Sequence, residues 1–550
     1  MSKVYVIGDL NTDFFTYTGS RARFGEEQNA DFTHSIGGNA TNFAVAAASL
    51  GMDVNLVSMI GEDLFTRFLK AELAESKVNK LLVNSSSPNG FSNIFVKKGG
   101  ERGIFSNKGA LLELSSSLVS KKILSRLKKE DIVYFGGFFH LPKLRPGFVN
   151  LLKAIRRKEA KVFFDATFDE YGKWEVNSFL SLIDVFFLNE VELEHITKTK
   201  NKGKGIKKLF SMGANEIVLK LGSKGAEYFS RTQSFAMPAL NVKPVNATGA
   251  GDFFDAGFTY AFLNGFSSWN SLLISNFVAG KKIEKKHYFK PTESMVKNYL
   301  KNKNLVEVVK VKDYNMVSKL SAQLIVEQLN QKPDSVISIA AGKTPIGLYK
   351  ELVKAYEKKN VSFSKAVFIE MDEYLGLTNE KDSFAYVLQT KFLDKVNFKK
   401  QNIFLFDPFS KNFSKERKRI DSVVQRKPLD FVLLGIGANA HIAYNEPYTS
   451  FSSGTHFVKT HLKILKARKQ KFLGKIPNKA FTLGIKTISS AKKLVLIANG
   501  KPKANAIKKV VSSKPSVKVP ASILQKHPNS TIIVDRKAGS LLKNYIKGQK

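Results

Sequence analysis

Short apolar segments that alternate with longer helical patterns are the feature of this sequence that most restricts its fold. In the first half these segments are rich in valine, isoleucine and phenylalanine, and they cover residues 54–60, 132–135, 161–164, 185–188 and 216–219. Strands that alternate with helices form βαβ units, whose strands lie parallel in one sheet. The sequence therefore predicts an α/β fold.

The length of the chain predicts more than one domain. A chain of 550 residues is too long for one ordinary hydrophobic core. The first strand–helix pattern fades by Leu300, residues 301–304 are polar and lysine-rich, and a new strand begins at Leu305. We predict one domain over residues 1–300, a hinge over 301–304 and a second α/β domain over 305–550.

Composition excludes several classes of protein. An apolar fraction of 43% with 24% charged residues is typical of a folded soluble protein. The absence of cysteine excludes disulfides, thiolate zinc sites and cysteine nucleophiles, and it suits a reducing compartment. The chain starts without the pattern of a signal peptide, and no apolar run approaches the roughly 20 residues of a membrane helix. We expect a cytoplasmic protein with no membrane partner.

The net charge of +40 has two interpretations. Such a charge could serve to bind nucleic acid or another anionic surface. It could also reflect a lysine-biased proteome, with phosphorylated substrates as an additional reason. The lysines are scattered through the whole chain and no basic motif interleaved with aromatic residues is present, so we favour the second interpretation and do not expect nucleic acid as a partner.

A glycine-rich segment at residues 246–257 predicts an anion-binding site. We expect a strand that ends near Val245, a turn through the glycines and a helix over Phe253–Leu263. The free N–H groups and the dipole at the start of a helix favour an anion, which predicts an anion hole at Gly249, Ala250 and Gly251. A carboxylate beside it, Asp252, suits removal of a proton from an attacking hydroxyl. The alternative is a plain glycine-rich turn with an acidic helix start.

The segment from Gly249 to Asp252 resembles the signature of the ribokinase-like (PfkB) family of carbohydrate and nucleoside kinases. The resemblance implies a doubly wound sheet with a small β lid, ATP and Mg²⁺ as cofactors, Asp252 as the base, and loop amides that hold the transferring phosphate. The family usually has Asp where this chain has Asn246. That position helps to organise a monovalent-cation site in some members, so the departure weakens the case for such a cation here.

Two polar clusters in the first half are candidates for sugar binding. One follows a strand predicted over Lys3–Gly8, where open α/β sheets bind ligands, and the other precedes a helix of small apolar residues that stops at Gly51. By resemblance these clusters contact the sugar, and residues 14–17, 31–35, 92–97 and 102–106 form the lid. As an alternative, Asn and Asp commonly make turns. The candidates are Asn11, Asp13, Gly38, Asn39 and Asn42.

Two further segments resemble the nucleotide-binding parts of the same family. An Asn-x-x-Glu pair implies a site that positions Mg²⁺ through its waters, with no direct protein ligand to the metal. A helix cap would give the same pattern. A loop over 220–225 resembles the nucleotide loop, with Lys220 in place of the usual Thr, and one asparagine borders the adenine by resemblance. The candidates are Asn189, Glu192, Lys220, Gly222, Gly225 and Asn276.

The second half repeats the strand–loop–helix arrangement of an anion site. A strand over 336–340 leads into Gly342-Lys343-Thr344, and Pro345 stands at the start of a helix over Ile346–Tyr356. Two later segments, at 368–377 and 430–447, place acids or an imidazole just after an apolar strand.

The segments MDEYLGL at 371–377 and HIAYNEP at 441–447 resemble glucosamine-6-phosphate deaminase, and the resemblance extends over Val306–Ile533. It implies a second, Rossmann-like α/β domain without a cofactor. In it His441 assists opening of the sugar ring, Asp372 moves a proton from C2 to C1, and Glu446 orients the imidazole. The implied phosphate-binding residues are Gly342, Lys343, Thr344, Lys471 and Lys503.

One departure from that family concerns the residues before the histidine. The family has Asp-Gly where this chain has Asn439-Ala440, and an asparagine cannot supply a second negative charge to the imidazole. Weaker activity or an altered substrate therefore stays open.

These motifs predict a bifunctional enzyme of amino-sugar metabolism that acts on small sugars, sugar phosphates and a nucleotide. One half phosphorylates glucosamine or a related hexose with ATP and Mg²⁺, and the other converts glucosamine 6-phosphate to fructose 6-phosphate and ammonia. Alternatively the kinase acts downstream on fructose 6-phosphate, or on another sugar or a nucleoside. A further alternative is a sugar-phosphate sensor without turnover. We expect a homo-oligomer.

Overall fold

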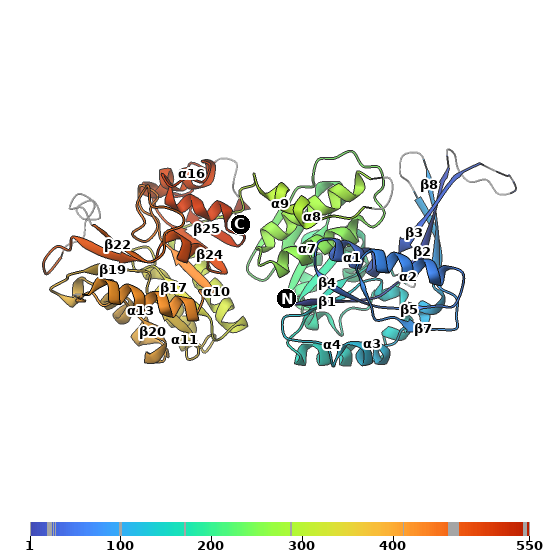
Figure 1. Ribbon diagram of the computed structural model, residues 1–550, viewed down its shortest axis with the longest axis horizontal. Coiled ribbons are helices and arrows are strands. Elements are labelled where there is room, and N and C mark those ends of the chain that lie inside the picture. Colours follow the sequence, from blue (N-terminus) through green and yellow to red (C-terminus); the bar gives the residue numbers. More distant parts are fainter. Residues whose placement is uncertain are drawn as a thin grey trace. The chain divides into compact units, whose positions relative to one another are not determined.

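The computed structural model describes residues 2–18, 25, 27, 29–97, 102–169, 172–285, 289–410, 412–459, 472–542 and 547–548. The chain forms two compact units, Met1–Lys301 and Asn302–Lys550 (Figure 1). Each unit has its own sheet and its own hydrophobic core, so each is described separately.

The first unit is built on a nine-stranded sheet with the order β15-β14-β13-β12-β11-β10-β1-β4-β6. The strands from β6 to β13 in this order are parallel, and β14 and β15 are antiparallel additions at one edge. This confirms the predicted α/β class. The strands are β1 (Lys3–Ile7), β4 (Asp53–Val57), β6 (Asn79–Lys80), β10 (Ile132–Phe135), β11 (Lys161–Asp165), β12 (Val185–Asn189), β13 (Glu216–Lys220), β14 (Ala226–Phe229) and β15 (Ser234–Met237).

Helices cover both faces of this sheet, and alternate side chains of each strand enter opposite cores. In β1, Val4 and Val6 belong to one core, whereas Tyr5 and Ile7 belong to the other. The first core is closed by α1 (Asn39–Ser49), α2 (Phe65–Glu75), α7 (Ala250–Leu263), α8 (Ser268–Ile283) and α9 (Glu293–Leu300). The second is closed by α3 (Ser116–Ile123), α4 (Phe148–Arg157), α5 (Glu190–Thr197) and α6 (Lys202–Ser211).

A separate four-stranded sheet projects from the first unit (Figure 1). Its order is β3-β2-β8-β9, and the segments predicted for a small β-sheet lie within these strands. Asn11 and Asp13 are therefore part of a strand, and the alternative that they form a turn is wrong. The strands are β2 (Asn11–Thr18), β3 (Asp31–Gly37), β8 (Gly90–Lys97) and β9 (Arg102–Asn107).

Two strand predictions in the first unit need correction. The segment before Asn246 is not a strand, because Pro238 and Pro244 have no N–H to donate to a sheet ladder. Instead, the amides of Val245 and Asn246 donate to the carbonyl of Ile283 at the end of α8, at 2.7 and 3.1 Å. The helix that follows starts at Ala250, three residues before the predicted start. The strand predicted over 54–60 is divided into β4 and β5 (Met59–Ile60), and β5 pairs with β7 (Val83–Asn84).

The second unit contains a parallel sheet with the order β20-β18-β17-β21-β24-β25-β16-β26. The strands are β16 (Glu307–Val311), β17 (Val336–Ile339), β18 (Val367–Ile369), β20 (Ile403–Phe404), β21 (Phe431–Leu434), β24 (Lys493–Ala498), β25 (Ser530–Asp535) and β26 (Lys547–Gly548). A three-stranded antiparallel sheet lies beside it, made of β19 (Asp372–Leu375), β23 (Lys479–Thr482) and β22 (His456–Lys459).

Helices also cover both faces of the second sheet. One core contains side chains of α10 (Tyr314–Gln331), α11 (Ile346–Glu357) and α12 (Phe384–Lys391). The other contains side chains of α13 (Phe413–Arg426), α15 (Ile485–Ser489) and α16 (Ala504–Ser512).

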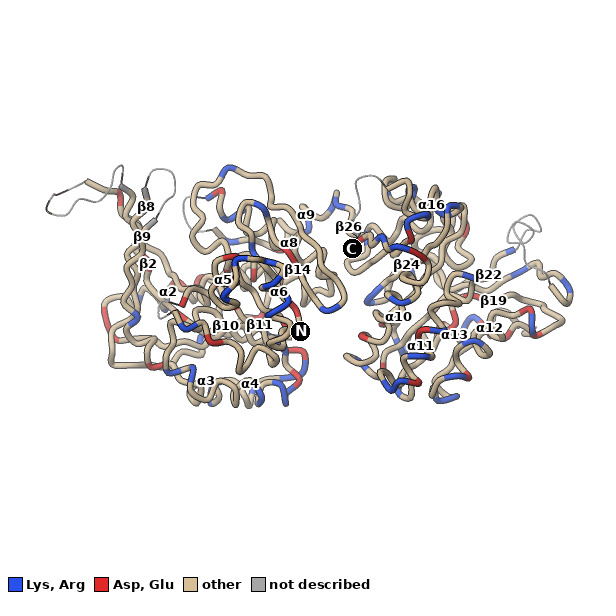
Figure 2. Tube along the Cα trace, turned by 180° about the vertical axis from the view of Figure 1, so that it is seen from behind, with Lys and Arg blue, Asp and Glu red and all other residues tan. Residues whose placement is uncertain are grey.

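No helix in the described part of the chain is both long and apolar enough to span a membrane. Lysine and arginine are spread over many elements of both units (Figure 2).

A glycine in α7 sets the distance between α7 and α8, and we predict that its replacement destabilises the first unit. A Cβ at Gly257 would lie 2.9 Å from Ser275 Cα. Gly257→Ala should lower the free energy of unfolding by about 1–3 kcal/mol, because the helices must separate. The control is Gly203→Ala in α6, where the nearest atom would be 3.5 Å away and stability should rise by about 1 kcal/mol. Denaturant unfolding measures both, and equal effects would contradict the prediction.

Candidate active sites

The carboxylate of Asp252 is the centre of the first site. Asp252 lies in the first turn of α7 and is 2% exposed. Asn39 Nδ2 donates to its Oδ1 at 3.1 Å, and Asn42 Nδ2 donates to its Oδ2 at 3.0 Å. Both asparagines stand at the start of α1, so the two predicted sugar-binding residues directly hold the predicted base.

The surroundings of Asp252 favour a carboxyl group that takes up a proton near neutral pH. Burial raises the pKa of Asp252 to about 8, and the nearby charge of Asp165 adds to this increase. A pKa in this range is suited to a group that accepts a proton from a hydroxyl and later releases it.

The loop before Asp252 presents backbone amides to an anion. Gly249 has φ 74°, a left-handed conformation that favours glycine, and no described side chain caps the start of α7. Asn246 shapes the loop from its other end, since its Oδ1 accepts the amide of Thr248 at 2.9 Å. The predicted anion hole at Gly249, Ala250 and Gly251 thus lies at this helix start, although the amide of Ala250 already donates to the carbonyl of Ala247 at 3.2 Å.

Lys220 lies directly behind this loop. Its Nζ is 2.8 Å from Asp165 Oδ1 and 3.3 Å from Asp255 Oδ2, and a Cβ at Gly251 would lie 3.4 Å from the same nitrogen. Although burial opposes the charge, the carboxylates of Asp165 and Asp255 raise the pKa of Lys220, which is therefore an ammonium at neutral pH. Sequence reasoning missed Asp165 and Asp255, because their roles depend on contacts between distant strands and helices.

Asn189 and Glu192 form a reciprocal helix cap at the start of α5. The amide of Glu192 donates to Asn189 Oδ1 at 3.0 Å, and the amide of Asn189 donates to Glu192 Oε2 at 2.8 Å. The capping interpretation of this motif is therefore correct for the structure as it stands. Burial raises the pKa of Glu192 to about 7, and the charge of Asp165 contributes. A role toward Mg²⁺ remains a proposal.

The other predicted nucleotide-binding residues have structural contacts of their own. Gly222 and Gly225 have φ values of 57° and 99°, and a Cβ at Gly225 would lie 2.0 Å from the carbonyl oxygen of Met237. Asn276 Nδ2 donates to the carbonyls of Met237 and Pro238, each at 3.2 Å. These contacts account for the residue types without a nucleotide.

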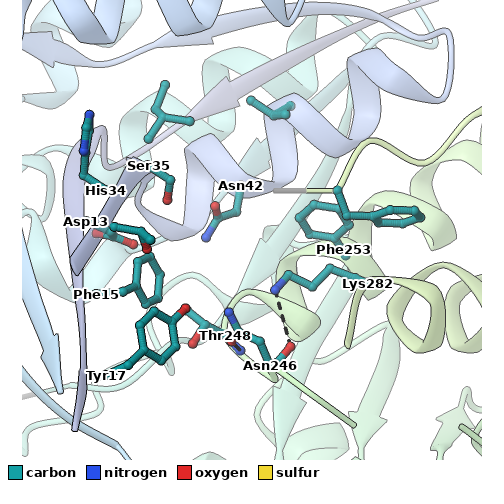
Figure 3. A pocket seen from close by; sticks show the side chains of 14 residues that line it. Asp13, Phe15, Tyr17, His34, Ser35, Asn42, Asn246, Thr248, Phe253 and Lys282 are labelled. Atoms are coloured by element: carbon teal, nitrogen blue, oxygen red, sulfur yellow. Dashed lines mark hydrogen bonds between the residues drawn. The ribbon is translucent and has the colours of Figure 1, made fainter. Parts of the chain in front are cut away.

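A cavity of about 160 Å³ lies between the small sheet, α1 and the loop that precedes α7 (Figure 3). Asp13 and Asn42 line it, whereas Asn11, Gly38 and Asn39 do not. Sequence reasoning missed most of its wall, including the aromatic residues and a lysine. The remaining lining residues are Phe15, Tyr17, Thr33, His34, Ser35, Ile36, Val45, Asn246, Thr248, Phe253, Lys282 and Phe289.

Glycines of neighbouring strands make room for the polar side chains of β2. A Cβ at Gly37 would lie 2.1 Å from the carboxylate of Asp13, and a Cβ at Gly90 would lie 2.6 Å from Asn11 Oδ1. Asn11 Oδ1 is buried and has no hydrogen-bond partner among the described residues. An unpartnered buried carbonyl is costly. Because Asn11 does not line the cavity, its contact with a sugar stays a prediction.

The second site lies where neighbouring strands of the second sheet end. The loops after β18, β17, β21 and β24 meet there, because these strands are adjacent and parallel. Asp372 begins β19 and pairs with Thr482 of β23. Thr482 Oγ1 in turn accepts the amide of Tyr444 at 3.2 Å. Thr482 therefore connects the strand of Asp372 to the loop that carries His441 and Glu446.

Asn439 joins the histidine to the glutamate in this loop. His441 Nδ1 is 2.7 Å from Asn439 Oδ1 and 3.1 Å from Glu446 Oε1, and Asn439 Nδ2 donates to Glu446 Oε2 at 2.6 Å. An amide carbonyl can only accept, so in this contact Nδ1 of the imidazole is the donor. Asn439 thus orients the ring although it brings no charge.

The backbone around His441 is shaped by two small residues. The imidazole lies over Gly437, where a Cβ would be 2.1 Å from the ring. Ala440 has φ 67°, in the left-handed region that favours glycine. Sequence reasoning named neither as a site residue, although glycines in the segment Gly435-Ile436-Gly437 are a usable signal for close approach.

The predicted phosphate-binding residues are only partly brought together. A Cβ at Gly342 would have open space around it, and Lys343 is exposed. Thr344 Oγ1 donates to Asn499 Oδ1 at 3.2 Å, which joins the loops after β17 and β24. Lys503 Nζ donates to the carbonyl of Ile436 at 2.5 Å. Lys471 lies outside the described residues.

Comparison with family models assigns each half of the chain. Residues 1–293 match the pfkB family carbohydrate kinase model, and residues 314–533 match the model of glucosamine-6-phosphate isomerases and 6-phosphogluconolactonase. The glucosamine-6-phosphate deaminase of Clostridium acetobutylicum is 40% identical over 241 residues, which cover 43% of this chain and 100% of that protein.

Solved structures are similar to each half as well. A monomeric glucosamine-6-phosphate deaminase is 33% identical to this chain, with a TM-score of 0.42. The match covers 43% of this chain and 100% of that one. The ribokinase of Thermotoga maritima is 24% identical to this chain, with a TM-score of 0.48. The match covers 55% of this chain and 100% of that one.

The contact between Gly437 and the imidazole leads to a testable prediction. Gly437→Ala should displace the His441 ring, because the added Cβ would overlap it at 2.1 Å. A displacement of this size should reduce ammonia release from glucosamine 6-phosphate, the reaction that the sequence resemblance implies, by about 100-fold. Gly435→Ala is the control, since a Cβ there meets no atom within 4 Å. An unchanged rate in Gly437→Ala would show that the ring position does not matter.

Proposed function

The chain belongs to the pfkB family of carbohydrate kinases in its first half and to the glucosamine-6-phosphate isomerase family in its second, and it is a sugar kinase fused to a deaminase. From this premise we propose that it is a bifunctional enzyme of amino-sugar metabolism. The first unit transfers a phosphoryl group from ATP to a sugar, and the second converts glucosamine 6-phosphate to fructose 6-phosphate and ammonia. The carboxylate of Asp252, held by two amides beside an uncapped helix start, is the observation that carries the kinase assignment.

In the first site the residues of the chain position the acceptor and remove its proton. The sugar hydroxyl lies against Asp252, which takes the proton as the oxygen attacks the γ-phosphorus of ATP and the bond to the β-phosphate oxygen breaks. The amides at Gly249–Gly251 and the ammonium of Lys220 behind them stabilise the transferring phosphoryl group. Asn39 and Asn42 keep Asp252 aimed at the hydroxyl.

The residues near Lys220 fit a hydrated magnesium ion. Asp165 and Glu192 stand at the carboxyl ends of β11 and just after β12, and carboxylate oxygens are the acceptors that Mg²⁺-bound waters prefer. Each oxygen of Glu192 that accepts from Asn189 has a second lone pair for a water. When bound, the ion neutralises charge on the nucleotide phosphates.

In the second site an imidazole and a carboxylate share the proton transfers. Nε2 of His441 exchanges the proton of the ring oxygen as the sugar opens, while Asn439 and Glu446 hold Nδ1. Asp372 takes the proton from C2 and returns it to C1, which leaves an imine at C2. Water then adds to C2 and the C–N bond breaks, so that ammonia leaves and the ketose phosphate remains. Thr344 and Lys503 lie on the loops that would receive the phosphate.

The fusion suggests that the two reactions are consecutive, and two orders fit. The kinase could phosphorylate glucosamine and so supply the deaminase, or it could phosphorylate the fructose 6-phosphate that the deaminase releases. Both orders use the same base, Asp252.

Variants of the two carboxylates test the bifunctional proposal. Asp252→Asn should reduce sugar-dependent ADP formation by about 10²–10⁴-fold, because the hydroxyl loses its base, and leave ammonia release unchanged. Asp372→Asn should do the reverse. ADP and ammonia are measured separately in the same samples. If either variant keeps its own reaction at the wild-type rate, the assignment of that half is wrong.

The pKa of Asp252 predicts how the kinase responds to pH. The base must be deprotonated, and its pKa is raised to about 8, so kcat/KM should rise with pH and level off above about 8. Asp165→Asn should move this rise to lower pH, since it removes a neighbouring negative charge and leaves burial as the main cause. Ammonia release, measured in the same buffers, is the control. A kinase profile that is flat from pH 6 to 9 would contradict the assignment.

A further inference from the structure

Lys282 is the one lysine or arginine among the buried polar residues in the described part of the chain. It lies in the last turn of α8 and is 8% exposed, although the protein has 87 lysine and arginine residues in all. Its neighbour Lys281 pairs with Glu284 at 2.8 Å and stays half-exposed. A buried ammonium group needs hydrogen bonds or opposite charge around it, and interactions within the chain hold Lys282 in place at this site.

The side chain of Lys282 runs into the cavity of the first site (Figure 3). Its Nζ donates to the carbonyl of Asn246 at 3.4 Å, at the start of the loop that leads to Asp252. Asn42, which lines the same cavity, donates to Asp252. A ligand in this cavity would therefore have its reacting hydroxyl near Asn42 and another part of the molecule near Lys282.

The charges of the cavity wall are arranged on opposite sides. Asp13 is the one carboxylate among the described residues that line it, and Figure 3 shows Asp13 and Lys282 across the cavity from each other. The labelled residues near Lys282 on this wall, Asn246, Thr248 and Phe253, are neutral. An anionic group on the ligand would pair with the ammonium there, and hydroxyl groups would suit the carboxylate of Asp13.

We propose that Lys282 binds an anionic group of the acceptor, so that the kinase phosphorylates a sugar that already carries a phosphate. This inference rests on the proposed function and selects the second of the two orders. The deaminase releases a ketose phosphate, which has both the hydroxyls and the anion that the cavity can receive. Its free hydroxyl gives its proton to Asp252 and attacks the γ-phosphorus of ATP, and the products are ADP and a sugar bisphosphate.

The opposite order suits the cavity less well. Glucosamine has no anion to pair with Lys282, and its partly protonated amine could pair only with Asp13 on the opposite wall. A neutral hexose would use the ammonium as a hydrogen-bond donor alone.

The test compares acceptors and variants with the full chain, ATP and Mg²⁺. Fructose 6-phosphate, glucosamine 6-phosphate, gluconate, fructose and glucosamine are offered in turn, and ADP is measured. Fructose 6-phosphate should have the highest kcat/KM of the five. Preference for gluconate would show that a carboxylate and not a phosphate is recognised, and preference for fructose or glucosamine would overturn the proposal.

Variants at two adjacent lysines distinguish binding of the acceptor's anionic group by Lys282 from support of the loop that starts at Asn246. Lys282→Met should raise KM for fructose 6-phosphate by about 10- to 100-fold, as expected for loss of a hydrogen-bonded charge, with a smaller change for fructose. Lys282→Arg should retain most of the affinity, and Lys281→Met is the matched control that should have no effect. An equal loss of kcat with every acceptor would mean that Lys282 supports the loop alone, and would overturn the proposal.

The result also distinguishes this inference from the function on which it rests. If none of the acceptors supports ADP formation, the proposed kinase function fails. If an uncharged sugar is phosphorylated and Lys282→Met matches wild type, the kinase function stands and the inference about Lys282 fails.

Discussion

Two side-chain amides hold the carboxylate on which the first unit depends. Asn39 and Asn42 reach Asp252 across more than 200 residues of sequence, and they do so because α1 and α7 pack on the same face of one parallel sheet. The contact requires that the sheet, both helices and the glycine loop are in place at once. Formation of this site is therefore coupled to folding of the whole unit, and the polar groups at its centre are satisfied by one another until a substrate arrives.

The two units solve a similar problem with different chemistry. Each sets a proton-accepting group at the carboxyl edge of a parallel sheet, near a loop that leads into a helix. The first unit buries its base, and burial raises the pKa of Asp252 to about 8. The second leaves its imidazole partly exposed and orients it through the oxygens of Asn439 and Glu446, which face Nδ1.

Much of the fold was predictable because apolar periodicity records which residues face a core. The strand Lys3–Ile7, the four strands of the small sheet and the helix that starts at Asn39 follow from local patterns. The strand expected before Asn246 failed because its prolines remove ladder donors. Local motifs also led to Asp252, but they could not show that Asp165, Asp255 and Lys282 surround the same site, since these residues meet only through tertiary packing. For Asn189 and Glu192 the sequence was compatible with a helix cap or with a ligand site. The reciprocal hydrogen bonds in the structure show the cap.

The backbone conformation of Ala440 lowers the stability of the second unit. Ala440 has a left-handed backbone conformation, with φ 67°, that glycine adopts without strain. In a residue with a side chain this conformation costs roughly 1–2 kcal/mol. The methyl group is buried and does not belong to the reacting groups. Ala440→Gly would relieve this conformation. Because Ala440 stands between Asn439 and His441, a change in stability at this position also affects how the imidazole is held.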